Sequence, residues 1–187
     1  MYTNEKIRSV GTLGADAEDV TCSVLAVKSL DGSFDLVAFS EFELAAQALL
    51  DGKIDAMVVP GAYPGIAKFI MHEGLQVAWV YTFIIPSLVF VSKHPTMKNE
   101  YRTLYNHPAT NALLGDVHTR WNAHQNVSSN TVACLEVLAN GSDSCAVTNA
   151  VCAQKYGLHI HKVLREGINM PFTVFTARTF QTQRSAS

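Results

Sequence analysis

The stretch from Leu50 to Pro60, LDGKIDAMVVP, decides the predicted fold. An apolar, helix-like run ends at Leu50 and is followed by Asp51-Gly52, a usual helix stop. The apolar segment 56–59 then has the length and composition of a buried strand, and it closes at Pro60. A turn of small residues, 61–65, follows and can open another helix. The sequence therefore predicts alternating helices and strands, with ligands binding beyond the carboxyl ends of the strands.

The same order of elements recurs in the second half of the chain. The segment 138–141 (LANG) ends a helix, 144–147 (SCAV) forms a strand, and Thr148-Asn149 leads into another helix. Two such strand ends facing each other predict a cleft that binds a small molecule. We expect an α/β fold of two lobes, each a small, mostly parallel sheet flanked by helices, with right-handed crossovers. Lobe 1 is predicted to hold residues 1–87 and 168–187, and lobe 2 residues 88–167.

Local signals also predict where several elements begin. Asp16, Glu18 and Asp19 are carboxylates at the favourable end of a helix predicted over 16–28. Ser40 and Glu43 have the spacing of a capping box for the helix that runs to Leu50. The segment 115–126 is polar and is expected to be an exposed connection.

Composition and charge exclude several classes of function. The 187 residues are 48% hydrophobic and carry a net charge of −2, without a basic stripe, so no nucleic-acid partner is expected. The longest apolar run, Leu75 to Val91, is interrupted by Pro86 and by polar residues, which favours two strands over a membrane span. The first residues lack the apolar core of a signal peptide, so a cytoplasmic location is expected. The length of the 75–91 run also suggests a homodimer face.

Neither a metal nor another cofactor is expected. The four cysteines, Cys22, Cys134, Cys145 and Cys152, form no CxxC pair and are interpreted as reduced, structural thiols, with a catalytic thiol as the alternative. His159 and His161 alternate on one strand, but no closed set of four ligands accompanies them.

Several short motifs, taken in order along the chain, resemble the catalytic domain of prephenate dehydratases. The resemblance is closer still to their offshoot, the prephenate decarboxylase of bacilysin biosynthesis. It runs from about Val10 to Phe175, and its strongest part is Thr148-Asn149 followed by 154–158 (QKYGL). The other matching motifs are 12–14 (TLG), 58–60 (VVP), 62–63 (AY), 107–108 (HP) and 130–131 (NT). The resemblance implies two lobes of the periplasmic-binding-protein type with the ligand between them, and no ACT domain is expected to follow.

Two departures from the family pattern point to a changed reaction or substrate. Dehydratases carry Thr-Arg-Phe on the final strand, where the threonine assists loss of the hydroxyl and the arginine holds a carboxylate; here the segment 169–172 is NMPF. The family's first loop, Gly-Pro-x-Gly-Thr-x-Ser, suits a carboxylate, whereas this chain has 14–19, GADAED. A ligand anion near these acids would be repelled by about 1 kcal/mol or more per close pair. Either the acids point outward, or the ligand is not a prephenate-like dianion at this position; we interpret them as surface residues that complement the helix dipole.

The candidate site residues lie at the predicted strand ends and helix starts. His107 and Tyr63 are the candidate catalytic residues, as proton donor and hydrogen-bond donor. Alternatively, His107 only stabilises its turn and Tyr63 is a packed aromatic. The candidate substrate-binding residues are Thr12, Leu13, Gly14, Ala62, Asn106, Ser129, Asn130, Thr131, Thr148, Asn149, Met170 and Phe172.

The resemblance implies a lyase that acts on a small cyclic carboxylate in specialised, antibiotic-producing metabolism. Two alternatives stay open. The chain is either a prephenate dehydratase-like protein of a tropone-antibiotic (tropodithietic acid) pathway, acting on a ring compound other than prephenate, or a binding module that closes on a small molecule without turnover.

Overall fold

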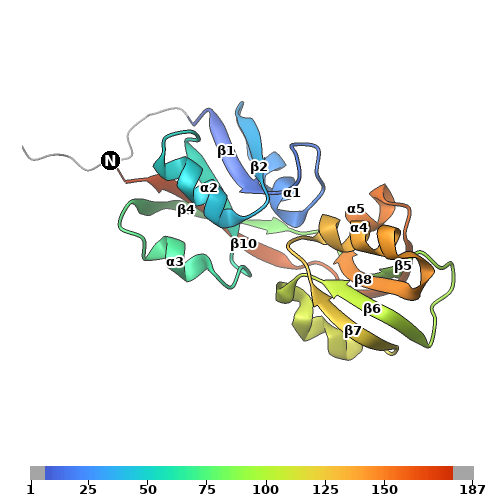
Figure 1. The fold of residues 1–187 in the computed structure, drawn as a ribbon. Coiled ribbons are helices and arrows are strands. Elements are labelled where there is room, and N and C mark those ends of the chain that lie inside the picture. Colours follow the sequence, from blue (N-terminus) through green and yellow to red (C-terminus); the bar gives the residue numbers. More distant parts are fainter. Residues whose placement is uncertain (1–6, 179–187) are drawn as a thin grey trace, which may run out of the picture.

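The computed structural model describes residues 7–178 and contains two five-stranded sheets. The first sheet has the order β2-β1-β3-β10-β4, and the second has the order β7-β6-β8-β5-β9. The two sheets lie in separate halves of the molecule (Figure 1). The strands of the first sheet are β1 (Ser9–Leu13), β2 (Asp35–Phe39), β3 (Ala56–Pro60), β4 (Leu75–Ile84) and β10 (Asn169–Ala177). Those of the second are β5 (Leu88–Ser92), β6 (Glu100–Asn106), β7 (Arg120–Asn126), β8 (Ser144–Asn149) and β9 (His159–Arg165). The helices are α1 (Cys22–Lys28), α2 (Phe42–Leu50), α3 (Ile66–Ile70), α4 (Asn130–Asn140) and α5 (Ala150–Lys155), with 3₁₀ segments η1 (Pro108–Asp116) and η2 (Gly141–Asp143).

The two-lobed α/β fold is confirmed, but the sheets are mixed rather than mostly parallel. In the first sheet β1 pairs in parallel with β2 and β3, whereas β10 is antiparallel to β3 and β4. In the second, β6 is parallel to β7 and β8, whereas β5 is antiparallel to β8 and β9. The antiparallel pairings arise because β10 and β5 follow connections that cross between the lobes, and not helical crossovers within one lobe.

Each sheet is covered on both faces by apolar side chains. In the first lobe, α2 and α3 pack on one face with Met57 and Val59, while α1 packs on the other with Ala56 and Val58. In the second lobe, α4 and α5 cover one face and η1 the other. Strand β3 is buried on both faces, as its continuous apolar sequence predicts.

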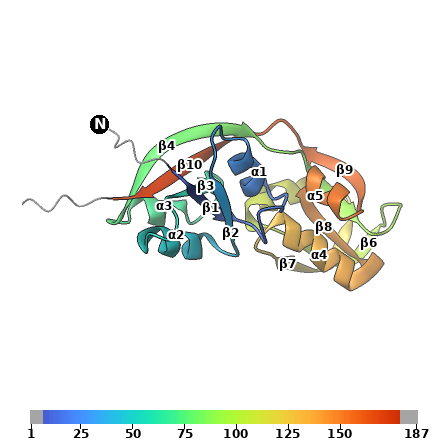
Figure 2. The same ribbon diagram turned by 90° about the horizontal axis from the view of Figure 1, so that it is seen from above.

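The chain crosses between the lobes twice, and the two crossings lie together. Residues 85–87 lead from β4 to β5, and residues 166–168 lead from β9 back to β10. The amide of Ile85 donates to the carbonyl of Ile168 at 3.0 Å, so the two segments are bonded to each other. Strands β4 and β10 run side by side along one side of the molecule (Figure 2). The exact bounds predicted for the lobes stay a prediction.

The helix predicted over residues 16–28 begins later than expected. Residues 14–18 form bends and turns, and α1 starts at Cys22 because Thr21 is its N-cap and accepts a hydrogen bond from the Val24 amide at 3.2 Å. The interpretation of the three acids as surface residues holds for Asp16 and Glu18, but it is wrong for Asp19, which is only 2% exposed.

Two further local predictions are wrong. The helix α2 has Glu41 as its N-cap, without a side-chain capping bond, so the predicted Ser40–Glu43 capping box does not form; instead Glu43 accepts a hydrogen bond from Tyr63. The segment 120–126, predicted as part of a connection, is the edge strand β7. Its polar composition is explained by its position, since it pairs only with β6 and is largely exposed.

None of the helices in the described part of the chain is long and apolar enough to cross a membrane.

Candidate functional site

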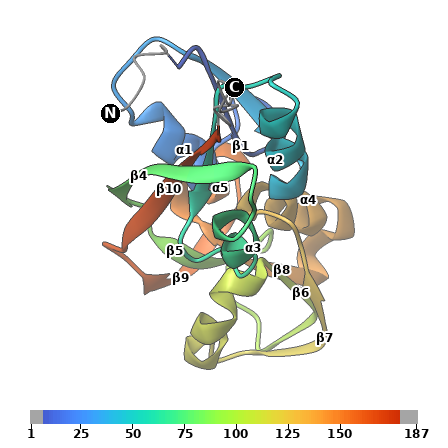
Figure 3. The ribbon, with the colours of Figure 1, turned by 90° about the vertical axis from the view of Figure 1, so that its left-hand side faces the viewer.

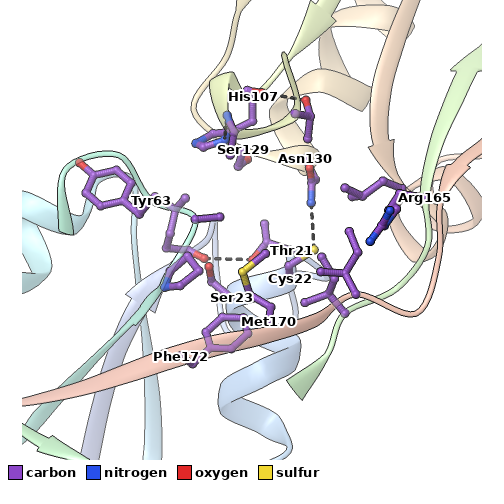
Figure 4. A pocket seen from close by; sticks show the side chains of 18 of the residues that line it. Thr21, Cys22, Ser23, Tyr63, His107, Ser129, Asn130, Arg165, Met170 and Phe172 are labelled. Atoms are coloured by element: carbon purple, nitrogen blue, oxygen red, sulfur yellow. Dashed lines mark hydrogen bonds between the residues drawn. The ribbon is translucent and has the colours of Figure 1, made fainter. Parts of the chain in front are cut away.

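A pocket of about 280 Å³ lies between the lobes, and both of them contribute to its walls. Figure 4 shows the start of α1 and strand β10 on one side, and His107, Ser129 and Asn130 of the second lobe on the other. Most of the lining is apolar. The lining residues are Leu13, Thr21, Cys22, Ser23, Phe42, Pro60, Ala62, Tyr63, Ile85, Leu88, His107, Ala109, Thr110, Ala112, Leu113, Ser129, Asn130, Arg165, Ile168, Met170 and Phe172.

Three consecutive residues at the start of α1 form the polar part of the first-lobe wall. The hydroxyl of Thr21 is fully used, because it donates to the Leu13 carbonyl and accepts from the Val24 amide. Ser23 is 5% exposed, and its hydroxyl has no hydrogen-bond partner among residues 7–178. Ser23 therefore offers the pocket a hydroxyl that is free to bond a ligand.

Cys22 links the two lobes and is chemically inert as a nucleophile. Its sulfur accepts hydrogen bonds from the amide groups of Asn130 at 3.3 Å and Asn149 at 3.8 Å, both in the second lobe. Burial raises the pKa of the Cys22 thiol to about 12, so the thiol stays protonated at neutral pH. The structure thus supports the structural interpretation of this cysteine, although it lines the pocket.

His107 lies at the start of η1 in a fixed orientation. Its Nδ1 accepts a hydrogen bond from the Ala109 amide at 3.1 Å, so in the neutral ring the proton is on Nε2. Burial lowers the pKa of His107, which favours this neutral form at pH 7. His107 therefore presents a neutral ring to the pocket, with Nε2–H available as a donor.

Tyr63 borders the pocket with its ring only. The hydroxyl donates to Glu43 at 2.7 Å and points away from the pocket (Figure 4). Glu43 in turn pairs with Lys68. In this arrangement the predicted role of Tyr63 as a hydrogen-bond donor to a ligand is not available, because its only proton is already donated to a carboxylate.

Arg165, at the end of β9, carries the only lysine or arginine charge in the described lining of the pocket, and no aspartate or glutamate is among the lining residues. It is exposed and makes no ion pair within residues 7–178. Figure 4 shows it on the opposite side of the pocket from Tyr63. The pocket is therefore an apolar cavity with one positive group at its mouth.

Of the predicted site residues, one group lines the pocket and another lies behind it. The lining residues are Leu13, Ala62, Tyr63, His107, Ser129, Asn130, Met170 and Phe172. The residues behind the wall are Thr12, Gly14, Asn106, Thr131, Thr148 and Asn149, all buried. Their polar groups are occupied: Thr12 donates to Val58, Thr148 to the carbonyl of Asn130, and Asn149 to that of Val20.

Asn106 and Asp19 hold parts of the wall in place. The amide group of Asn106 donates to the His107 carbonyl and to Thr110 and Asn111, which fixes the turn that carries His107. Asp19 accepts hydrogen bonds from the amides of Ala15 and Val20, both at 2.7 Å, and from the hydroxyl of Thr131 in the second lobe. Asp19 is thus a buried carboxylate that ties the loop before α1 to the start of α4.

Thr21 and Ser23 were not predicted as lining residues, and Arg165 was considered, with Arg102, only as a cleft charge that nothing in the sequence places. The expected helix start at Asp16 placed Thr21 and Ser23 in the interior of a helix, whereas they lie at its N-terminal end. A threonine four residues before Leu25 in an apolar helix is a capping signal that would have moved this boundary. No local signal identifies Arg165, because its approach to the pocket depends on the pairing of β9 with β5.

The fold is that of two-lobed α/β domains of the type II periplasmic-binding-protein kind, and the pocket lies between the lobes. In agreement, the periplasmic VFT2 domain of BvgS from Bordetella pertussis superposes with a TM-score of 0.56 at 15% identity, over 91% of this chain and 80% of that one.

Within this class, the similarity to prephenate enzymes is confirmed. A prephenate decarboxylase of Bacillus subtilis is 25% identical over 187 residues, which covers 93% of this chain and 89% of that protein. A prephenate dehydratase from Arthrobacter aurescens, solved with L-Phe, superposes with a TM-score of 0.68 at 16% identity, over 91% of this chain. The chain spans 61% of the length of that dehydratase. No family model matches the chain.

Proposed function

We propose that this protein is a lyase of the prephenate decarboxylase type that acts on a small cyclic carboxylate in specialised, antibiotic-producing metabolism. The observation that carries the proposal is the chemistry of the pocket: apolar walls, one arginine at the mouth and no carboxylate in the described lining. The similarity to prephenate decarboxylases over 93% of the chain supports it. A cytoplasmic location and a homodimer accompany the proposal as expectations.

An apolar pocket favours the loss of a carboxylate as CO2. When the bond from the ring carbon to the carboxylate breaks, its electron pair passes into the ring system, and the charge is dispersed in the transition state. A carboxylate without a cation or hydrogen-bond donors is destabilised more than this dispersed charge, so transfer into apolar surroundings lowers the barrier. One proton must then reach a ring carbon, so the balance is a carboxylate and a proton converted to CO2 and a C–H bond.

His107 is the candidate that can orient the ring or pass on this proton. Its neutral Nε2–H can donate to a carbonyl or hydroxyl of the ligand, since Nδ1 is occupied by the Ala109 amide. A neutral imidazole is a weak acid, so water is the alternative source of the proton and His107 is then a positioning residue. Tyr63 is not available for this role, because its hydroxyl already donates to Glu43.

Dehydration is disfavoured at this site. Expulsion of a ring hydroxyl needs a proton donor beside the leaving oxygen. Met170 and Pro171 occupy β10 where the dehydratase motif has its threonine and arginine, and neither side chain carries a proton to donate.

The test is to incubate the purified protein with prephenate while absorbance and released CO2 are followed. We expect CO2 together with a non-aromatic keto acid. Rapid formation of the aromatic product phenylpyruvate would overturn the exclusion of dehydration. Binding without any reaction would favour the binding module. Neither binding nor reaction would favour a substrate other than prephenate, as in the tropone-antibiotic alternative.

A further inference from the structure

We propose that the pocket fixes a ring compound at two ends, with a single carboxylate bound by Arg165 and a ring oxygen bound by Ser23. The inference rests on the proposed function only in taking the ligand to be a small cyclic carboxylate. It adds which residues hold that ligand and how many of its carboxylates are held by charge.

Arg165 is suited to one carboxylate. Its guanidinium group offers a planar fork of N–H donors that matches the two oxygens of a carboxylate. Within residues 7–178 no acid neutralises it, so a ligand carboxylate meets no competitor. Its exposed position at the end of β9 places this contact at the mouth, where the carboxylate keeps part of its hydration.

The wall formed by the two lobes' contact disfavours a second carboxylate. Asp19 lies behind this wall and accepts a hydrogen bond from Thr131. In the chain, Asp19 comes two residues before the lining residue Thr21, and Thr131 directly follows the lining residue Asn130. The donors that a ligand anion would use there, the amides of Ala15 and Val20 and the Thr131 hydroxyl, are already bonded to Asp19. A ligand anion at this end would meet like charge and few free donors.

Ser23 supplies the second end. The residue is 5% exposed, and its hydroxyl faces the pocket without a hydrogen-bond partner among the described residues. A hydroxyl that faces the pocket and is not used within the protein can bond a hydroxyl or carbonyl oxygen on the ligand ring. Figure 4 shows Ser23 beside Met170 and Phe172, which are positioned to contact the ring itself.

One chemical consequence follows for a substrate with two carboxylates. The carboxylate bound by Arg165 is stabilised and is retained. The other carboxylate lies against apolar lining residues beside Tyr63, such as Phe42 and Pro60, on the side of the pocket opposite Arg165, and it is the group that is lost. The pocket thus selects between the two carboxylates by the presence of a cation at only one end.

The experiment measures the dissociation constants of 4-hydroxyphenylpyruvate and phenylpyruvate by calorimetry. Both have one carboxylate and a planar ring, and only the first has a ring hydroxyl. We expect the wild-type protein to bind both and to prefer 4-hydroxyphenylpyruvate. Arg165→Gln should weaken both acids about tenfold or more, whereas Arg165→Lys should restore part of the affinity. Ser23→Ala should remove the preference for 4-hydroxyphenylpyruvate and leave phenylpyruvate unchanged.

Arg102→Gln is the matched control, because Arg102 is an exposed arginine on β6 that does not line the pocket. It should leave both constants unchanged, and thermal unfolding should show that all variants are folded. The proposal is overturned if neither acid binds the wild type, if Arg165→Gln binds both as the wild type does, or if Ser23→Ala leaves the preference intact. If both acids bind as expected but prephenate is not turned over, the proposed function fails while this inference stands.

Discussion

At the scale of a single residue, the burial of His107 makes the stability of the folded protein depend on pH. Its Nδ1 bond to the Ala109 amide caps the turn, and its burial lowers its pKa from the usual value near 6.5. In the unfolded chain the ring takes up a proton below about pH 6.5, whereas the folded protein resists it. The contribution of His107 to stability is therefore complete above this pH and is lost as the pH falls through its lowered folded pKa.

We therefore expect the free energy of unfolding to fall as the pH is lowered from 7 to 5. His107→Asn, which keeps an acceptor for the Ala109 amide, should reduce this slope, as measured by urea unfolding at several pH values. Part of the slope should stay, because burial and the neighbouring His159 and His94 also lower the pKa of His161. His118→Asn, at an exposed position, serves as the control for loss of a histidine. An unchanged slope in His107→Asn would show that this group does not titrate as argued.

At the residue scale, the exposure of Asp16 and Glu18 was predicted correctly from the sequence, whereas the burial of Asp19 was not. Asp16, Glu18 and Asp19 have the same charge and lie within four positions of one another, yet only Asp19 is buried. What distinguishes it is a set of donors that includes Thr131, a residue 112 positions away. Periodicity and charge describe neighbours in the chain, so they do not reveal a partner at this separation.

At the scale of an element, strand β4 is an apolar edge strand with an exposed face. It is an edge strand of ten residues without a charged side chain, and it exposes Val77, Trp79, Val80 and Ile84. Figure 3 shows β4 in front of the other strands of the first sheet when the molecule is viewed from this side. Long, apolar edge strands are normally protected from uncontrolled pairing by charge or by a partner. This strand lies within the 75–91 run that predicted a dimer face.

We expect the protein to be a homodimer that uses the exposed face of β4. Light scattering coupled to gel filtration should give twice the mass of the chain. Val80→Lys should shift the protein to a monomer, because Val80 is 55% exposed and a charge there is compatible with the folded monomer but not with an apolar interface. Leu135→Lys, at an apolar residue of α4 that is 46% exposed, is the matched control and should stay dimeric. A monomeric wild type would contradict the prediction.

The presence of a helix or strand was predicted better than the residues at which it begins and ends. The strands β3 and β8 lie close to their predicted positions because continuous apolar runs between turn residues have few other solutions. The start of α1 was misplaced because Asp16 and Thr21 are both acceptable N-caps, and contacts of Asp19 with the second lobe decide between them. Strand β7 was missed because an edge strand needs no apolar alternation.

The whole molecule depends on how the two lobes are tied together. The described bonds between the loop before α1 and the second lobe include Asp19 to Thr131, Val20 to Asn149 and Glu18 to Lys155. The donors are Thr131 at the start of α4, Asn149 at the N-cap of α5 and Lys155 at the end of α5. Because this contact forms one wall of the pocket, stability and ligand binding should be coupled through Asp19.

Asp19→Asn should lower the free energy of unfolding by about 1–3 kcal/mol, because the amide retains only one acceptor oxygen and its NH2 group faces donors. The same variant should weaken binding of 4-hydroxyphenylpyruvate, since the lobes are held less firmly. Glu18→Gln is the matched control; its side chain is exposed and its carbonyl, which accepts from Lys155, is retained, so a change below about 0.5 kcal/mol is expected. Equal stability of Asp19→Asn and the wild type in urea unfolding would refute the role of Asp19.

By itself, the sequence determined most of the order of helices and strands, the two-lobed α/β class and the similarity to prephenate enzymes. These properties depend on short-range patterns of apolar residues, turn residues and motifs, which are legible along the chain. Only the tertiary structure decided the mixed direction of the strands and the composition of the pocket. Cys22 meets Asn130 across 108 positions, and Arg165 reaches the mouth through the pairing of β9 with β5. Such contacts arise from the packing of one lobe against the other, and no local pattern encodes them.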